Sequence, residues 1–129
     1  MQFNIIGFSE ITTLTIGDYS FYYYQGNLAI RNCSQLQTIS FGQYSFYYFK
    51  ANITNMNSLK SITFGSYSFR NGEYLDIQEL PQLNQLSFNS ESFNKAKSLR
   101  LSNLNAISGL EIITNNFYYG EYIILESIK

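Results

Sequence analysis

A motif of six residues recurs along the chain at intervals of about 24 residues. Its three clear copies read IGDYSF, FGQYSF and FGSYSF, a weaker copy reads FNSESF, and a degraded one reads IITNNF. The Phe residues that close these copies are spaced 25, 23, 24 and 24 residues apart: Phe21, Phe46, Phe69, Phe93 and Phe117. A repeat of this length indicates a solenoid, in which each unit buries its apolar side chains only by stacking on its neighbours.

The other apolar positions also fall into columns when the copies are aligned. One column precedes the glycine of the motif and reads Ile16, Phe41, Phe64, Phe88 and Ile112. Another contains the sole cysteine and reads Phe8, Cys33, Met56, Leu80, Leu104 and Ile128. We expect Cys33 to fill the core, because its column mates are apolar and the chain has no His to activate a thiol.

Apolar and polar residues alternate at two places in each unit, which predicts two short strands per coil. The first strand is of the Leu28–Asn32 type and the second of the Ile39–Phe41 type. No segment has a sustained helical period. We therefore predict a mainly β protein with a single domain over residues 1–129, built from about five coils with two short parallel β-sheets and little or no helix.

The unit from Leu28 to Ile39, which reads L-x-I-x-N-C-x-x-L-x-x-I, resembles the leucine-rich repeat. The motif that follows it resembles the I-G-x-x-A-F half-repeat of the BspA-like subfamily. Ser stands in place of that Ala at four positions: Ser20, Ser45, Ser68 and Ser92. The resemblance covers essentially the whole chain. It implies a leucine-rich-repeat solenoid without catalytic activity, of a kind found outside cells or on their surfaces, that binds proteins or mediates adhesion.

The resemblance also suggests an asparagine ladder, which this chain carries incompletely. The corresponding column reads Gly7, Asn32, Asn55, Glu79, Asn103 and Ser127. We expect Asn32 to point inward at this position and Glu79, as a substituted member of the ladder, to be partly buried.

Composition excludes several classes of function. The chain has 8 Lys+Arg and 9 Asp+Glu, so it has no basic stripe of the kind that a nucleic-acid partner requires. No apolar run reaches the roughly 18 residues of a membrane span. With no His and one Cys, the usual metal sites and an internal disulfide are ruled out. We expect no catalytic residues, no metal and no cofactor.

Two surfaces are candidates for binding. The first is the outward face of the first strand type, which is the usual ligand face of leucine-rich repeats. Its mixed polar character suits a protein or glycan ligand better than phosphate, although a plain solvated face would look the same. The residues of this candidate face are Arg31, Asn52, Thr54, Asp76, Gln78, Arg100 and Ser102.

The second candidate is an aromatic ridge after the closing Phe of the motif. Exposed tyrosines combine a large contact area with a polar tip and often mark contact surfaces, but they would equally cover the core. The ridge contains Tyr22, Tyr23, Tyr24, Tyr47, Tyr48, Tyr118 and Tyr119. Two glycosylation sequons also occur, and only Asn52 is expected to point outward; a glycan on Asn32 would clash with the core.

Both ends of the predicted solenoid lack a capping module and expose strands without partners, at Phe3 and Ile5 and at Ile123, Leu125 and Ile128. Two explanations fit these open ends: the chain is a segment of a longer repetitive surface protein, or copies of it stack head to tail. Our main expectation is a non-enzymatic scaffold, extracellular or on a cell surface, that acts in adhesion or in protein or glycan binding. The alternative is a structural subunit whose copies stack head to tail into a filament through these open ends.

Overall fold

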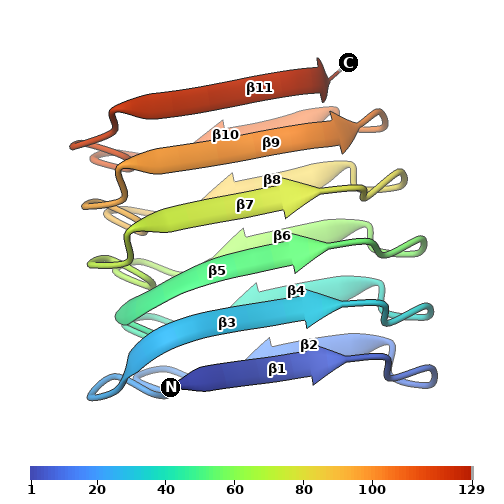
Figure 1. The fold of residues 1–129 in the computed structure, drawn as a ribbon, viewed down its shortest axis with the longest axis horizontal. Helices are drawn as coiled ribbons and strands as arrows, with labels where there is room; N and C mark the ends of the chain where they lie inside the picture. The colour runs from blue at the N-terminus through green and yellow to red at the C-terminus, as the bar shows by residue number, and fades with distance from the viewer. Residues whose placement is uncertain (129) are drawn as a thin grey trace.

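The computed structural model describes residues 1–128, which form eleven β-strands and no helix. The strands build a flattened solenoid with two parallel sheets that face each other, and the strands of the two sheets run in opposite directions (Figure 1). Since the described residues contain no helix, none is available to cross a membrane.

The two sheets differ in strand length. The long sheet has six strands in the order β1 (Gln2–Ile6), β3 (Gln25–Arg31), β5 (Tyr48–Thr54), β7 (Tyr74–Gln78), β9 (Ser98–Leu104) and β11 (Tyr122–Ile128). The short sheet has five, in the order β2 (Thr13–Ile16), β4 (Thr38–Phe41), β6 (Ser61–Phe64), β8 (Gln85–Phe88) and β10 (Gly109–Ile112). The prediction of a mainly β solenoid of about five coils with two parallel sheets is confirmed.

Equivalent residues of successive coils lie opposite one another with no shift. In the long sheet Leu28 pairs with Ala51 and Ala51 with Leu75, and in the short sheet Phe41 pairs with Phe64. The period of the sequence therefore equals one turn of the solenoid, and like positions stack along its axis. Cys33 is fully buried, as predicted.

The core is organised around two columns of phenylalanine rings. In the first, the rings of Phe21, Phe46, Phe69, Phe93 and Phe117 stack with centroid separations of 4.9, 5.5, 4.8 and 5.8 Å. In the second, Phe41, Phe64 and Phe88 stack at 5.2 and 5.0 Å. The columns meet edge to face, for instance at 5.0 Å between Phe41 and Phe69. Both arrangements are favourable for aromatic rings.

The turn that carries the first column has two left-handed residues in every coil. In the second coil these are Tyr44, with φ of 59°, and Phe46, with φ of 49°. Each costs about 1–2 kcal/mol in this conformation, and ring stacking and hydrogen bonding offset that cost. The buried Ser45 between them donates its hydroxyl to the carbonyl of Gly42 at 2.8 Å. An Ala at this position would not make that bond, which gives the Ser of the motif a physical role.

The column of the incomplete asparagine ladder lies at the opposite turn, where the chain leaves the long sheet. The side chains of this column point in a different direction from the one expected. Asn32 and Glu79 are both exposed, so the predictions that Asn32 points inward and that Glu79 is partly buried are wrong. Each is the first residue after a long-sheet strand and has a positive φ, 58° and 57°, and this left-handed step turns the side chain toward solvent. There it bonds to the next coil instead, as when Asn55 donates to Asn32 at 3.2 Å.

Replacing Phe69 with Ala should lower the free energy of unfolding by roughly 3–5 kcal/mol, because the ring is fully buried and contacts both columns. Urea unfolding followed by circular dichroism measures the loss. Tyr23→Ala is the matched control, since Tyr23 is 90% exposed and its loss should cost less than about 0.5 kcal/mol. Equal losses in the two variants would contradict the assignment of the core.

Candidate binding surface

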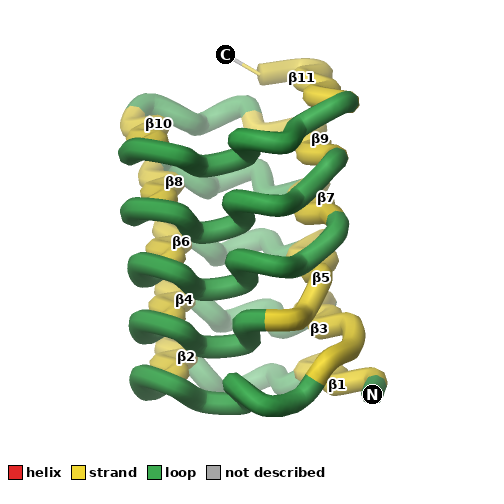
Figure 2. The backbone as a smooth tube through the Cα atoms, turned by 90° about the vertical axis from the view of Figure 1, so that its left-hand side faces the viewer, coloured by secondary structure: helices red, strands yellow, loops and turns green. Residues whose placement is uncertain are grey.

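A ladder of stacked tyrosines lies along the edge of the solenoid where the chain passes from the short sheet to the long sheet. The rings of Tyr19 and Tyr44 are 4.9 Å apart and those of Tyr44 and Tyr67 are 4.7 Å apart, each pair nearly parallel. They occupy the first left-handed position of the turn. Figure 2 looks onto this edge, where the loops of successive coils lie one above another.

The sequence analysis missed this ladder, although its signal was the Tyr of the motif itself. The residues just after the motif join it. Tyr22 contacts Tyr23 and Tyr47 with ring centroids 5.0 Å away in each case, and Tyr47 contacts Tyr48 at 4.9 Å. We call the resulting surface the tyrosine patch, and it comprises Tyr19, Tyr22, Tyr23, Tyr44, Tyr47, Tyr48 and Tyr67.

Three residues of the predicted ridge lie outside the patch. Tyr24 packs against Phe21 with centroids 6.3 Å apart. Tyr118 and Tyr119 belong to the last coil, where Lys95 lies 5.9 Å from the ring of Tyr119. They are separated from the other tyrosines because the third and fourth coils carry Arg70 and Asn94 at the equivalent positions. The predicted ridge is therefore two surfaces.

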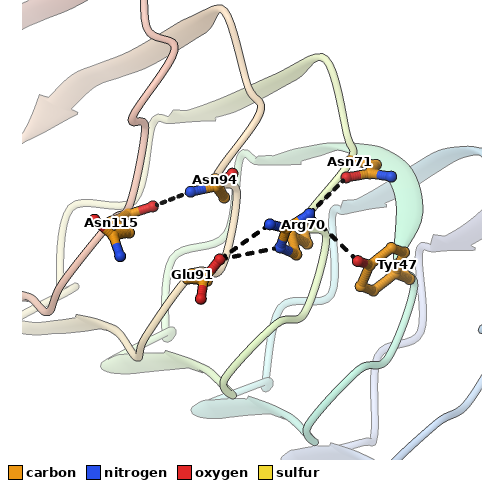
Figure 3. Close-up of polar contacts among 6 residues, drawn as sticks. All are labelled: Tyr47, Arg70, Asn71, Glu91, Asn94 and Asn115. Carbon is orange, nitrogen blue, oxygen red and sulfur yellow. Dashed lines mark hydrogen bonds and ion pairs between the residues drawn. The ribbon is translucent and has the colours of Figure 1, made fainter.

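Arg70 forms the boundary of the tyrosine patch on the side of the fourth coil (Figure 3). Its Nε and Nη2 donate to Oε1 of Glu91 at 3.2 and 3.1 Å, and its Nη1 donates to the hydroxyl of Tyr47 at 3.4 Å. Nη1 also reaches Oδ1 of Asn71 at 3.4 Å. One side chain thus connects three successive coils. Beyond it, the buried Asn94 donates to the backbone carbonyl of Asn115 at 2.8 Å.

These contacts change the acidity of the groups involved. Partial burial lowers the pKa of Arg70, but hydrogen bonds to Glu91 and Tyr47 outweigh it, so the net pKa is raised. The Glu91 carboxylate raises the pKa of Tyr67 because it accepts a hydrogen bond from the neutral phenol and repels the phenolate. Partial removal from water, followed by the neighbouring phenols, raises the pKa of Tyr22. Tyr22 and Tyr67 therefore keep their phenolic protons to higher pH than an ordinary tyrosine does.

The other predicted surface, on the long sheet, also forms one continuous face. Its residues lie in two columns across β3, β5, β7 and β9, with Asn52, Asp76 and Arg100 in adjacent register. The second column contains Arg31, Thr54, Gln78 and Ser102. The sequence placed all seven residues together correctly, but Ser102 is buried by its neighbours.

Many polar groups of this face bond to each other. Gln78 donates to Oδ2 of Asp76 at 3.0 Å, and Arg100 lies 3.7 Å from Glu126. The side-chain nitrogen of Asn52 contacts Oδ1 of Asn27 and the hydroxyl of Tyr74, each at 3.3 Å. Glycosylation of Asn52 stays a prediction, and a glycan there would displace these contacts.

A third column of this face escaped the sequence analysis. Asn27 pairs with Lys50, and the ring of Tyr74, the first residue of β7, lies beside Lys50. Tyr74 donates to Oδ1 of Asn27 at 3.1 Å, and the ammonium of Lys50 lies 5.6 Å from the ring of Tyr74. The alternation that placed the other two columns extends to these residues and was the available signal.

Comparison with known proteins adds no family assignment: no family model, no curated protein and no solved structure matches this chain. The evidence for the two candidate surfaces therefore comes from the sequence and the geometry alone.

The Glu91→Gln variant should lower the pKa of Tyr67 toward 10.0, its ordinary value, because the negative charge beside the phenol is removed. Titration of ring-labelled tyrosine, followed by NMR, measures the shift. Glu73→Gln is the control and should leave the pKa of Tyr67 unchanged. An unchanged pKa of Tyr67 in Glu91→Gln would show that the Glu91 carboxylate does not govern the acidity of this phenol.

The raised pKa of Tyr67 also determines how the free energy of unfolding changes with pH. Because the pKa of Tyr67 is higher in the folded than in the unfolded chain, the folded state holds the phenolic proton more tightly. The contribution of Tyr67 to the free energy of unfolding is complete below the pKa of the unfolded chain, and it is lost as pH rises through the pKa of the folded chain. Thermal melts of the wild type and Glu91→Gln at pH 8 and above pH 10 should show a steeper alkaline loss in the wild type. A wild-type loss no steeper than that of the variant would contradict this linkage.

Proposed function

We propose that the chain is a non-enzymatic binding scaffold of the BspA-like leucine-rich-repeat type, which acts in adhesion or in protein or glycan binding outside the cell or on its surface. The observation that carries the proposal is the tyrosine patch. The repeat holds its rings in a fixed array, so little conformational entropy is lost when a ligand binds.

The patch is chemically suited to such ligands. Tyr23 is 90% exposed and Tyr19 60% exposed, so both offer aromatic surface beside a phenolic hydroxyl. Tyrosines of this kind stack on the apolar faces of sugar rings or on side chains of a protein and donate hydrogen bonds at their rim. We assign the main contact to the patch, because the long-sheet face satisfies many of its polar groups internally.

The repeat unit supports the finer assignment to the leucine-rich-repeat class. Each L-x-I segment forms a strand of one parallel sheet, as Leu28 and Ile30 do in β3. The Asn that follows takes a left-handed turn, as Asn32, Asn55 and Asn103 all do. These features agree with the resemblance noted in the sequence.

The alternative, a structural filament, draws support from the last coil. Ile123 and Leu125 are 59% and 60% exposed at the edge of the long sheet. Exposed apolar edge strands recruit other chains. This observation favours association through the end of the solenoid.

A screen of glycans and extracellular-matrix proteins tests the proposal. The double variant Tyr23→Ala/Tyr48→Ala should weaken binding to any ligand found by at least about tenfold, since a few aromatic residues carry most of the energy of an interface. The matched variant Arg31→Ala/Asp76→Ala/Arg100→Ala should change affinity less than about threefold.

If instead the triple variant loses affinity and the double tyrosine variant does not, the binding site lies on the long-sheet face. No binding to any glycan or protein in the screen would count against the proposed function itself.

A further inference from the structure

A cavity of about 350 Å³ lies on the edge of the solenoid that carries the tyrosine patch, on the far side of Arg70. Residues from three successive turns line this turn-edge cavity: Arg70, Asn94, Asn115, Tyr118 and Tyr119. Its volume is at the small end of the roughly 300–1,000 Å³ that is usual for ligand sites. A cavity of this size suits one small ring rather than a segment of a protein chain.

The cavity exists because a short side chain interrupts a column of long ones. The backbone nitrogen of Lys95 bonds to the carbonyl of Arg70 at 2.9 Å, and that of Tyr119 bonds to the carbonyl of Asn94 at 3.4 Å. These bonds stack the three turns, so Arg70, Asn94 and Tyr118 hold equivalent positions in successive coils. The outer two are separated by two strand spacings, about 9.6 Å. The cavity therefore lies between paired turns and makes no use of the outer edges of β10 and β11.

Asn94 forms the floor of the cavity and is only 5% exposed. Its side-chain nitrogen donates to the backbone carbonyl of Asn115 at 2.8 Å, which fixes the orientation of the amide (Figure 3). Within residues 1–128 no donor bonds to its Oδ1, and this atom is not sealed off from the cavity that Asn94 lines. Buried polar groups are nearly always hydrogen-bonded. The floor thus offers a fixed acceptor that a ligand can satisfy.

Arg70 forms one wall and supplies a donor. A guanidinium has five N–H groups. Nε and one N–H of Nη2 bond to Glu91, and Nη1 bonds to Tyr47 and Asn71. The remaining N–H of Nη2 has no acceptor in the part of the chain that the structure describes. Because Glu91 lies 3.1 Å away, the charge of Arg70 is already paired, and this wall donates a hydrogen bond without requiring an anion.

Tyr118 forms the opposite wall. Its ring is 67% exposed and contacts Tyr119 edge to face, with centroids 5.1 Å apart. The ammonium of Lys95 lies 5.9 Å from the ring of Tyr119, so one face of Tyr119 is occupied. Tyr118 is therefore the ring that offers the most free surface to a ligand in the cavity.

We propose that the turn-edge cavity binds one uncharged pyranose ring of a glycan. The apolar C–H face of such a ring packs on Tyr118. Its hydroxyls both donate and accept hydrogen bonds, so they match the acceptor on Asn94 and the donor on Arg70. This inference rests on the proposed binding function, to which it adds a ligand class and a second contact.

The cavity and the tyrosine patch lie on the same edge, so one glycan can contact both. The turns after β2, β4 and β6 carry the patch, and those after β6, β8 and β10 line the cavity; Figure 2 shows all of them one above another. A glycan that runs along the solenoid axis places one ring in the cavity and others on the tyrosines. The two contacts use different side chains apart from Arg70, so each can be removed separately.

NMR titration with the methyl glycosides of glucose, galactose, mannose and N-acetylglucosamine tests the site. At least one of these probes should shift the side-chain amide signal of Asn94. A single ring in a shallow cavity makes few contacts, so we expect a dissociation constant on the order of 1 mM.

The Tyr118→Ala variant removes the aromatic wall and should weaken binding of that glycoside roughly tenfold, whereas Tyr118→Phe keeps the ring and should bind within about twofold of the wild type. Tyr122→Ala is the matched control: Tyr122 is 66% exposed and lines a different cavity, beside Tyr74. It should leave the affinity unchanged. Asn94→Ala removes the acceptor and should weaken binding about fivefold. Circular dichroism confirms that each variant folds.

No shift of the Asn94 signal with any of the four glycosides, or equal affinities of Tyr118→Ala and the wild type, would overturn the inference. Tighter binding of methyl glucuronide would overturn the assignment to an uncharged ring, and loss of binding in Tyr122→Ala would place the sugar in the other cavity. The patch variant Tyr23→Ala/Tyr48→Ala should still bind the glycoside. If the cavity binds none of the probes while that variant loses ligands of the wider screen, the proposed function stands and this inference fails.

Discussion

The stacking of each coil on an equivalent coil is the interaction on which the rest of the structure depends. It extends beyond the sheets into the turns, where the backbone nitrogen of Phe46 bonds to the carbonyl of Ser20 at 2.8 Å and that of Phe69 to Ser45 at 3.1 Å. Nearly the whole circumference of the solenoid is thus hydrogen-bonded to the coil above and below. Each position along the repeat therefore meets its own equivalent, about 4.8 Å away.

This constraint explains the composition. Two like charges at one strand spacing repel each other, so a column cannot repeat a charged residue cheaply. Only 13% of the residues are charged, whereas 18% are aromatic, because rings of the same kind stack well at this distance. Where charge does occur inside the array, neighbouring coils alternate its sign or neutralise it, as Arg70 and Glu91 do. The tyrosine patch is a consequence of the same rule at the surface.

The repeat alone predicted the fold, because a fixed period specifies which residues are stacked. It predicted the columns of Phe69 and of Cys33 and the outward face around Asp76 for the same reason. The directions of Asn32 and Glu79 were not predictable from alternation, since a left-handed residue at the end of a strand breaks the alternation. The extent of the tyrosine patch was also missed, because it depends on side-chain packing between adjacent columns, such as the contact of Tyr22 with Tyr44.

The proposed recognition site uses the edge of the first three coils, where equivalent turns place the tyrosines about one strand spacing apart. The ring separations of 4.9 and 4.7 Å along Tyr19, Tyr44 and Tyr67 follow from the stacking of the coils, so the array is set before a ligand arrives. Once a repetitive glycan or a protein surface has contacted one ring, its contacts with the next rings are intramolecular. Weak contacts at single tyrosines therefore suffice for strong overall attachment.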